Sequence, residues 1–360
     1  MSIVSSATLL LAALLAGLPG RGASHAAPAP RFFAADNPNI QYTGRVDFGQ
    51  ARKPRFWAPG VYITVRFKGP SCTVQLADEL LNGKSQNYVQ LVLDGQQSRR
   101  KLTGPATTLV VAENLPNTVH TLVICKDTEA GQGYIEFAGL TCARLLPPPA
   151  RPAHKIEFIG NSITCGYGAD MAEIACGKGE WYDQHNAYQA YGPRTARALG
   201  AEWQLTAESG IGLIHSCCNK PNLMPQEFGT IDLRVGGRPW DVRRYQPDVV
   251  TICLGQNDGV QDSVQFCGAY LAFLRTLRAD YPRARFVCLT SPMADARLTA
   301  VLRRYLTGVV AAAQAGGEQN IDKFFFARRY TSGCGAHPSL AEQALIGNEL
   351  TAYLRQTLHW

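Results

Sequence analysis

The chain has 360 residues and a formal net charge of +7, with 46% hydrophobic and 18% charged residues. These proportions are typical of a soluble globular protein and exclude a disordered or fibrous chain. At ~150 residues per domain, the length predicts about two domains. Because the basic residues are spread along the chain, nucleic-acid binding is not expected.

Residues 1–26 have the pattern of a secretory signal peptide. An apolar stretch over 7–16 is followed by Ser24 and Ala26 at the −3 and −1 positions of a cleavage site. The first three residues depart from the pattern, since they carry no Lys or Arg. The alternative, a buried N-terminal helix, is disfavoured by the three prolines between positions 19 and 30. We predict a secreted or periplasmic protein with no membrane span after removal of the signal.

Residues 31–146 are predicted to form an all-β domain. Short runs of residues alternate between apolar and polar, and turn signals such as Asn82-Gly83 and Asp94-Gly95 separate them. The runs cover 61–67, 72–76, 89–93, 122–124 and 135–137. Seven or so short strands without a helical stripe predict an antiparallel sandwich or jelly roll. The proline-rich segment 147–153 then acts as an extended linker.

Residues 154–360 are predicted to form an α/β domain. Nearly continuous apolar runs indicate buried parallel strands, and they cover 155–160, 202–207, 248–254, 285–290 and 322–326. Helical stripes lie over 266–277, 298–310 and 345–354. Repeated strand–helix units predict a doubly wound, flavodoxin-like parallel sheet with helices on both faces. Because such sheets bind ligands at the carboxyl ends of their strands, the residues just after each strand are the candidates for function.

Four segments after predicted strands carry suitable groups. Ser162 is either a nucleophile or a helix N-cap. Gly210 and Gly212 form either a turn or a site where backbone N–H groups face a ligand. Asn257 is either an amide donor or part of an Asx-turn. His337, in a Gly-rich loop before the last helix, is a candidate base.

Two other histidines and one known serine motif bear on these candidates. His185 and His215 also lie in loops and stay possible as bases. The G-x-S-x-G motif of α/β-hydrolases does not fit, because Thr164 stands where that motif has its second Gly.

The chain order Gly-x-Ser, Gly, Asn, His-Pro resembles that of the SGNH (GDSL-like) hydrolases. With GNSITCGYG, SGIGL, LGQND and a C-terminal HP behind a jelly roll, residues 35–358 are similar to family two carbohydrate esterases of the acetyl xylan esterase type. The phrases His120-Thr121 and TEAGQG over 128–133 share this similarity. The resemblance implies an exported esterase that removes O-acetyl groups from polysaccharides of the xylan or glucomannan type.

The resemblance also implies residue roles. Ser162 attacks the ester carbonyl and forms an acetyl-enzyme, while His337 accepts and later returns the proton. The backbone N–H groups of Ser162 and Gly212, with the Asn257 amide, form the oxyanion hole, and Gly210 is the alternative glycine. An acetylated polysaccharide or oligosaccharide is the expected partner. Neither a metal nor an organic cofactor is expected.

The chain departs from the family pattern before the histidine. Many SGNH hydrolases have an Asp two or three residues before it, where this chain has Gly335 and Cys334. We therefore expect a Ser–His dyad in which a backbone carbonyl or a more distant acid orients the imidazole. Ala336 replaces a frequent aromatic residue, so substrate contact at this position is not predicted.

Three aromatic residues are candidates for substrate contact. Trp181 and Tyr182 lie in the long loop 166–185, and Trp240 follows a Gly-Gly-Arg-Pro segment. They either stack on a sugar ring or pack the loops against the sandwich. Two alternative functions stay open: an esterase acting on lipid or bacterial-glycan esters, and a carbohydrate-binding protein with an inactive hydrolase domain.

All eleven cysteines follow residue 26, and an exported chain permits disulfides. Cys253 and Cys288 lie in apolar runs and are expected in the core. Cys165 and Cys176 flank a loop and are a candidate pair. Zinc-ligand spacings are missing, so no metal site is predicted.

Overall fold

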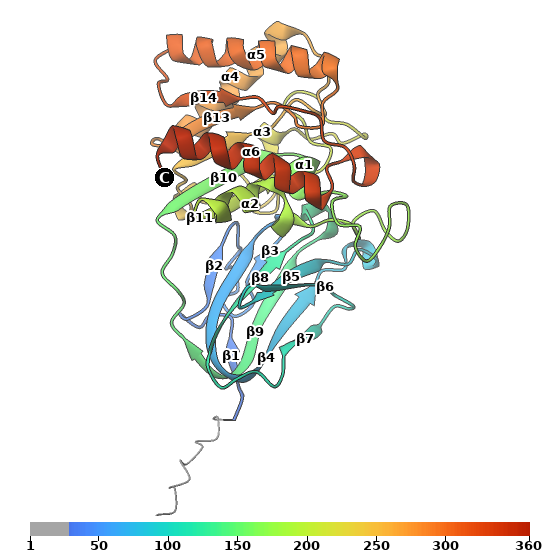
Figure 1. Ribbon diagram of the computed structural model, residues 1–360, viewed down its shortest axis with the longest axis vertical. Coiled ribbons are helices and arrows are strands. Elements are labelled where there is room, and N and C mark those ends of the chain that lie inside the picture. The colour runs from blue at the N-terminus through green and yellow to red at the C-terminus, as the bar shows by residue number, and fades with distance from the viewer. Residues whose placement is uncertain (1–28) are drawn as a thin grey trace, which may run out of the picture.

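The computed structural model describes residues 29–360, and the predicted signal peptide (1–26) lies outside this range. An antiparallel β domain is followed by a parallel sheet covered by helices (Figure 1). The predicted fold class is therefore confirmed.

The N-terminal domain is one hydrogen-bonded antiparallel sheet. Its order is β1-β9-β4-β8-β5-β6, with β2 and β7 paired to β4 and β3 paired to β9. Its strands in the described part of the chain are β1 (Arg31–Ala34), β2 (Gln41–Thr43), β3 (Arg55–Phe56), β4 (Tyr62–Asp78), β5 (Tyr88–Leu93), β6 (Gln96–Lys101), β7 (Thr107–Ala112), β8 (Val119–Lys126) and β9 (Ile135–Leu146). Two short 3₁₀ turns, η1 (Leu81–Gly83) and η2 (Ala130–Gln132), interrupt the loops.

Strand β4 differs most from the sequence prediction. Apart from Val61, the runs 61–67 and 72–76 are parts of this single strand, because a register irregularity between Lys68 and Cys72 carries the chain past Gly69-Pro70 without a turn. Strands β1, β2, β3, β6 and β7 were not among the predicted runs. The sequence of β6, QQSRRK, has no apolar alternation, since most of this edge strand stays partly or fully exposed.

The core of the N-terminal domain is completed by the second half of the chain. Alternate side chains of β4, β5, β8 and β9 point into it. Ile231, Leu233, Trp240 and Tyr245 belong to the same buried cluster, although they come from the loops before β12. The two domains therefore share apolar surface.

The C-terminal domain is a parallel sheet in the order β11-β10-β12-β13-β14. Its strands are β10 (His154–Gly160), β11 (Ala201–Ala207), β12 (Val249–Ile252), β13 (Arg285–Leu289) and β14 (Ile321–Phe324). The helices described here are α1 (Ser162–Cys165), α2 (Tyr191–Ala198), α3 (Met224–Glu227), α4 (Ser263–Asp280), α5 (Ala296–Ala315) and α6 (Leu340–Leu358), with the 3₁₀ turns η3 (Ala187–Gln189), η4 (Val242–Arg244) and η5 (Cys334–Ala336).

Helices cover both faces of this sheet, as Figure 1 shows. Helices α4 and α5 pack on one face against residues such as Ile252 and Phe286. Helices α2 and α6 pack on the other face against Phe158 and Leu289. The chain leaves β10 for β11 on one side and then for β12 on the other, so the carboxyl end of β10 is the topological switch point.

The linker is hydrogen-bonded to the N-terminal domain through Pro149 and Arg151. Residues 147–153 contain neither helix nor strand, and they join β9 to β10. The Arg151 guanidinium donates to Tyr42 O at 2.8 Å and to Thr43 Oγ1 at 3.0 Å, and Gln41 Nε2 donates to Pro149 O at 3.3 Å. The predicted extended spacer is thus held against β2.

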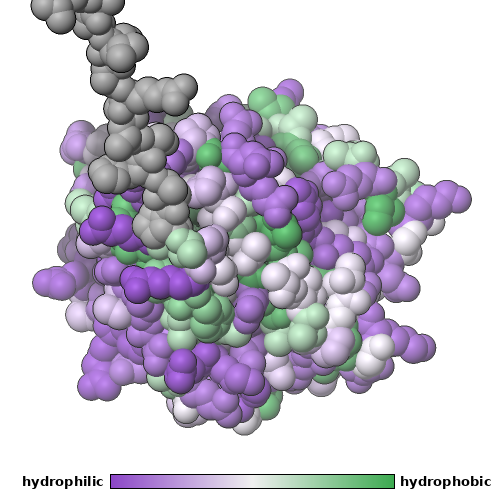
Figure 2. All heavy atoms as spheres, turned by 90° about the horizontal axis from the view of Figure 1, so that it is seen from below, coloured by the Kyte–Doolittle hydropathy of each residue, from purple (hydrophilic) through white to green (hydrophobic). Residues whose placement is uncertain are grey.

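The surface is mixed in character. Viewed from the end formed by the N-terminal domain, Figure 2 shows hydrophobic side chains scattered among hydrophilic ones. Exposed Phe32, Val110 and Val119 belong to strands of this domain. Within residues 29–360, no helix combines the length and apolar character needed to cross a membrane.

A buried arginine connects the two domains. Arg45 has a fully buried side chain and donates to Thr230 O at 2.6 Å and to Phe228 O. Its guanidinium lies 3.3 Å from Glu157 Oε1 in β10, which also accepts from Thr206 Oγ1 at 2.6 Å. A charge from the N-terminal domain thus balances a charge in the middle of the parallel sheet.

Replacement of Arg45 by Ala is expected to lower the free energy of unfolding by about 3–5 kcal/mol, because it leaves the Glu157 carboxylate buried without a cation. Guanidinium unfolding followed by tryptophan fluorescence measures this change. Arg243→Ala, which removes an exposed ion pair with Asp241, is the matched control and is expected to leave the midpoint unchanged. Equal midpoints for the two variants would contradict the claim that Arg45 neutralises the buried Glu157 carboxylate.

Candidate active site

Ser162 and His337 meet at the carboxyl edge of the parallel sheet. Ser162 begins α1 directly after β10, and His337 lies between η5 and α6. Although they are 175 positions apart, His337 Nε2 lies 2.8 Å from Ser162 Oγ. This is hydrogen-bond distance, so the imidazole is placed to accept the hydroxyl proton. Ser162 is 5% exposed.

The turn that presents Ser162 depends on its neighbours. The Asn161 side chain accepts a hydrogen bond from the Ile163 N–H, which caps α1, and donates to Cys253 O at 3.4 Å after β12. A side chain at position 160 would meet Thr164 Oγ1 at 2.1 Å, so only glycine fits there. The threonine that breaks the G-x-S-x-G pattern therefore packs against the glycine before the serine.

A backbone carbonyl orients His337. Its Nδ1 lies 2.9 Å from Gly335 O. Because a carbonyl oxygen only accepts, Nδ1 carries the hydrogen and Nε2 has a free lone pair toward Ser162. Of the two predicted possibilities, a carbonyl or a distant acid, the structure contains the carbonyl.

Burial shapes the basicity of His337. The ring packs against Tyr167, with the centroids 4.3 Å apart. Burial lowers the pKa of His337 below its ordinary value of 6.5, and this outweighs the hydrogen bond to Gly335 O, which raises it. The imidazole is therefore neutral at neutral pH, as a general base must be.

The two candidate glycines after β11 differ in their N–H groups. The Gly212 N–H donates to Ser216 Oγ at 2.9 Å, so it is already occupied. Gly210 has a left-handed φ of 81°, and among the described residues no acceptor binds its N–H. The geometry thus favours the alternative, Gly210, over Gly212 as an oxyanion donor.

Asn257 lies in the loop after β12 and is half-buried. Its Nδ2 donates one hydrogen to Ile211 O at 2.7 Å. The second amide hydrogen is therefore left to donate to another acceptor. The next residue, Asp258, is buried and accepts from the N–H groups of Leu213, Ile214 and His215 at 2.7–3.0 Å. Asp258, which the sequence interpretation did not single out, therefore ties the loop after β11 to the loop after β12.

A second residue that the sequence interpretation missed is Glu129 of the N-terminal domain. Its buried carboxylate accepts from Ser209 N and Ser209 Oγ, both at 2.6 Å, and lies 2.9 Å from His185 Nε2. Burial disfavours its ionisation, but the hydrogen bonds from His185 and Ser209 outweigh burial and lower the pKa of Glu129. The only sequence signal for it was the TEAGQG similarity.

His185 belongs to the wall of the site rather than to the dyad. It is completely buried and packs against Tyr167, which separates it from His337. Trp181 stacks on the same tyrosine, with centroids 5.8 Å apart, and is 47% exposed. Trp181 is thus an accessible aromatic surface beside the site. His215 is exposed.

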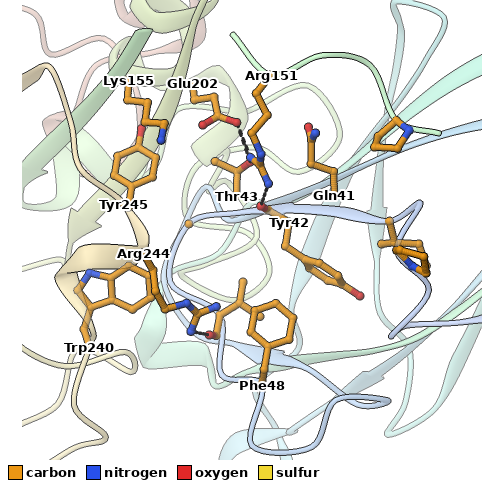
Figure 3. Close-up of a pocket in the computed structure, with 15 residues that line it drawn as sticks. Gln41, Tyr42, Thr43, Phe48, Arg151, Lys155, Glu202, Trp240, Arg244 and Tyr245 are labelled. Atoms are coloured by element: carbon orange, nitrogen blue, oxygen red, sulfur yellow. Dashed lines mark hydrogen bonds and ion pairs between the residues drawn. The ribbon is translucent and has the colours of Figure 1, made fainter. Parts of the chain in front are cut away.

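The other two candidate aromatic residues are buried, which agrees with the loop-packing alternative for them. Tyr182 is 3% exposed; its hydroxyl accepts from Gln86 N at 3.2 Å and donates to Lys84 O at 3.3 Å, so it packs the loop on the N-terminal domain. Trp240 is 6% exposed and lines a separate cavity of about 520 Å³ (Figure 3).

That cavity lies at the opposite edge of the sheet from Ser162. Lys155 and Glu202, which also line it, stand near the amino ends of β10 and β11. Strand β10 has seven residues, so at about 3.3 Å per residue it separates this cavity from Ser162 by about 20 Å.

The predicted Cys165–Cys176 pair is wrong. Cys176 forms a disulfide with Cys334, with their Cα atoms 5.1 Å apart. Cys165 is a buried thiol whose Sγ lies 3.9 Å from Glu129 Oε2. A further disulfide joins the neighbours Cys217 and Cys218. Cys253 and Cys288 are buried thiols in the core, as predicted.

In the described part of the chain, no group of three or more His, Cys, Asp or Glu side chains is arranged to hold a metal ion. The site instead combines a hydroxyl, a neutral imidazole, and backbone and amide N–H donors. This set of groups is suited to acyl transfer through a serine.

Comparisons with known proteins agree with this chemistry. Residues 42–149 match the model of the carbohydrate esterase 2 N-terminal family, and residues 158–339 match the model of the GDSL-like Lipase/Acylhydrolase family. The chain is 28% identical over 339 residues to an acetylxylan esterase / glucomannan deacetylase of Cellvibrio japonicus, which covers 91% of each protein.

Two further similar proteins come from Acetivibrio thermocellus and Clostridium thermocellum. The chain is 32% identical over 337 residues to the cellulase/esterase CelE of Acetivibrio thermocellus; the match covers 90% of this chain and only 40% of that protein. A family two carbohydrate esterase from Clostridium thermocellum, solved in complex with cellohexaose, has a TM-score of 0.82 at 30% identity, covering 89% of this chain and 99% of that one.

His337 is expected to titrate with a midpoint below 6.5, because burial penalises the imidazolium. A ¹H–¹³C NMR titration of the histidine rings measures it, and the spectrum of His337→Gln identifies the signal. A midpoint above 6.5 would show that the imidazolium is stabilised at this site.

Proposed function

Because the chain belongs to the GDSL-like lipase/acylhydrolase family and is a carboxylic-ester hydrolase, we propose that it is an exported carbohydrate esterase. Its substrate is an O-acetylated polysaccharide of the xylan or glucomannan type, and its nucleophile is Ser162. The observation that carries the serine mechanism is the 2.8 Å contact between Ser162 Oγ and His337 Nε2. The carbohydrate substrate is supported by the deacetylase and the cellohexaose-binding esterase among the similar proteins.

In the acylation step, Ser162 Oγ attacks the acetyl carbonyl carbon while its proton moves to His337 Nε2. The carbonyl oxygen becomes an oxyanion, which the N–H groups of Ser162 and Gly210 and the amide of Asn257 stabilise. The bond to the sugar oxygen then breaks, and His337 returns the proton to that oxygen. The products are the free sugar hydroxyl and an acetyl ester on Ser162.

Deacylation repeats these steps with water. His337 takes a proton from the water as its oxygen attacks the acetyl carbon, and the same donors hold the second oxyanion. The bond to Ser162 Oγ breaks, the serine regains its proton from His337, and acetate leaves. The Nδ1 hydrogen bond to Gly335 O keeps Nε2 directed at the reacting oxygen throughout.

Trp181 is the residue best placed to contact the sugar chain. Its ring is half exposed and stacked on Tyr167, which packs against His337. Aromatic rings bind the apolar faces of sugars, so a backbone sugar next to the acetylated one fits this surface. The remote Trp240 has no such place, because it lies about 20 Å away along the length of a seven-residue strand.

Ser162→Ala and His337→Ala are each expected to lower kcat on acetylated xylan by about 10³-fold or more, because the nucleophile and the base act as one unit. Acetate release measures this, with Ser98→Ala in β6 as the matched control. Unchanged turnover in both variants would contradict the mechanism. Faster turnover of long-chain 4-nitrophenyl esters than of acetylated xylan would instead favour a lipid substrate.

Asn257→Ala is expected to lower kcat by about 10²–10³-fold with little change in KM, since its amide acts mainly on the oxyanion. Steady-state kinetics with 4-nitrophenyl acetate separate the two constants. Asn320→Ala, on the exposed turn before β14, is the control. If KM rises while kcat is kept, Asn257 binds the ground state and not the transition state.

A further inference from the structure

The orientation of His337 rests on one short turn. The carbonyl that holds Nδ1 belongs to Gly335, two residues before the histidine, so the hydrogen bond constrains the ring only if the turn itself is constrained. A carboxylate two or three residues before the histidine would add a charged contact. This chain has Gly335 and Cys334 at those positions.

The turn has an uncommon backbone conformation. Gly335 has a φ of 60° and Ala336 a φ of 56°, both in the left-handed region. A residue with a Cβ, such as Ala336, adopts this region rarely, and it persists where surrounding contacts hold it. The turn therefore needs support from outside.

The outside contacts converge on Cys334. Its N–H donates to Gly168 O at 2.8 Å, and its side chain forms the disulfide with Cys176. Gly168 is itself left-handed, and a Cβ there would lie 2.6 Å from Cys334 O, so the two backbones are in close contact. The disulfide adds a covalent bond to the loop 169–185.

That loop also contacts the aromatic ring that packs on the histidine. Trp181, five positions after Cys176, stacks on Tyr167, and Tyr167 packs against His337. The imidazole is thus held from two directions. The turn carries it through the backbone, and the disulfide links that turn to the loop whose Trp181 stacks on Tyr167, the ring that packs on His337.

We propose that the Cys176–Cys334 disulfide is the positioning device for His337 and takes the place of the missing carboxylate, so that full esterase activity requires this bond to be oxidised. The inference rests on the proposed function, because it assumes that His337 is the base. A dithiol such as dithiothreitol supplies two electrons and two protons, which convert the disulfide to two thiols while the reductant becomes a cyclic disulfide.

The placement of the sulfur atoms fits this role. Cys176 lies on an exposed loop, so a reductant reaches the bond from solvent, and Cys334 is buried beside the turn. The oxidising environment of an exported protein keeps such a bond formed. The other disulfide, Cys217–Cys218, lies in the loop after β11, where Cys217 N donates to Gly210 O at 2.8 Å, so it needs its own control.

The experiment compares the double variants Cys176→Ser/Cys334→Ser and Cys217→Ser/Cys218→Ser with the wild type, before and after dithiothreitol. The first variant is expected to lose about tenfold or more in kcat on 4-nitrophenyl acetate, with KM changed little, because misplacement of a catalytic group affects the reaction more than binding. It should not respond to dithiothreitol. The wild type and the second variant should lose activity on reduction and regain it on reoxidation.

Two additional measurements separate positioning from folding. Below the unfolding transition of each variant, the downfield NMR signal of the His337 Nδ1 proton should be lost in the first double variant and kept in the second. If the first double variant does not fold, partial reduction of the wild type replaces it: activity should fall in proportion to alkylation of Cys176 and Cys334 measured by mass spectrometry.

Wild-type kcat in the first double variant, or full activity of wild type with Cys176 and Cys334 alkylated, would overturn the inference. In that case Ser162→Ala still reports on the proposed function, which stands if that variant is inactive. Activity retained by Ser162→Ala would overturn the proposed function itself, and with it the assumption that His337 is the base.

Discussion

The arrangement of the site depends on the hydrogen bonds of the Glu129 carboxylate. It binds both the N–H and the hydroxyl of Ser209, the residue before Gly210, and it also meets His185. Through His185 and Tyr167 it supports the packing around His337. Because the group is buried and ionised, each of these hydrogen bonds is strong, and none is easily exchanged for water.

Glu129 comes from the N-terminal domain, so this domain is part of the site. The two domains are also joined by buried contacts away from the site. The Arg45 guanidinium crosses from one domain into the other to meet Glu157, and Trp203 of β11 stacks on Tyr62 of β4 and donates to Gly60 O at 2.9 Å. The parallel sheet supplies Ser162 and His337, the proposed nucleophile and base, and the antiparallel sheet holds the surrounding loops in position.

Much of this organisation follows from sequence patterns. Period-two runs such as 89–93 and continuous runs such as 155–160 correspond to β5 and β10, because burial of one face or both faces of a strand leaves those patterns. The juxtaposition of Ser162 and His337 was predictable, since each follows an element that ends at the same edge of one sheet.

Other features were not predictable, because they depend on packing between distant segments. The partner of Cys176 lies 158 positions away, and no spacing rule points to it. The burial of Tyr182 and Trp240 could not be predicted from the sequence, because their exposure is decided by where the N-terminal domain sits. The sequence could not show that Gly212 is the less suitable of the two glycines. Only the folded loop shows that the Gly212 N–H already donates to Ser216 Oγ.

The bound linker has a mechanical consequence. Arg151 and Gln41 fasten the proline-rich segment to β2, and the buried Arg45 lies between the domains, so a hinge motion of one domain against the other would break several hydrogen bonds at once. Under the proposed function, adaptation to different sugar chains falls to individual side chains such as Trp181, not to opening and closing of the whole protein.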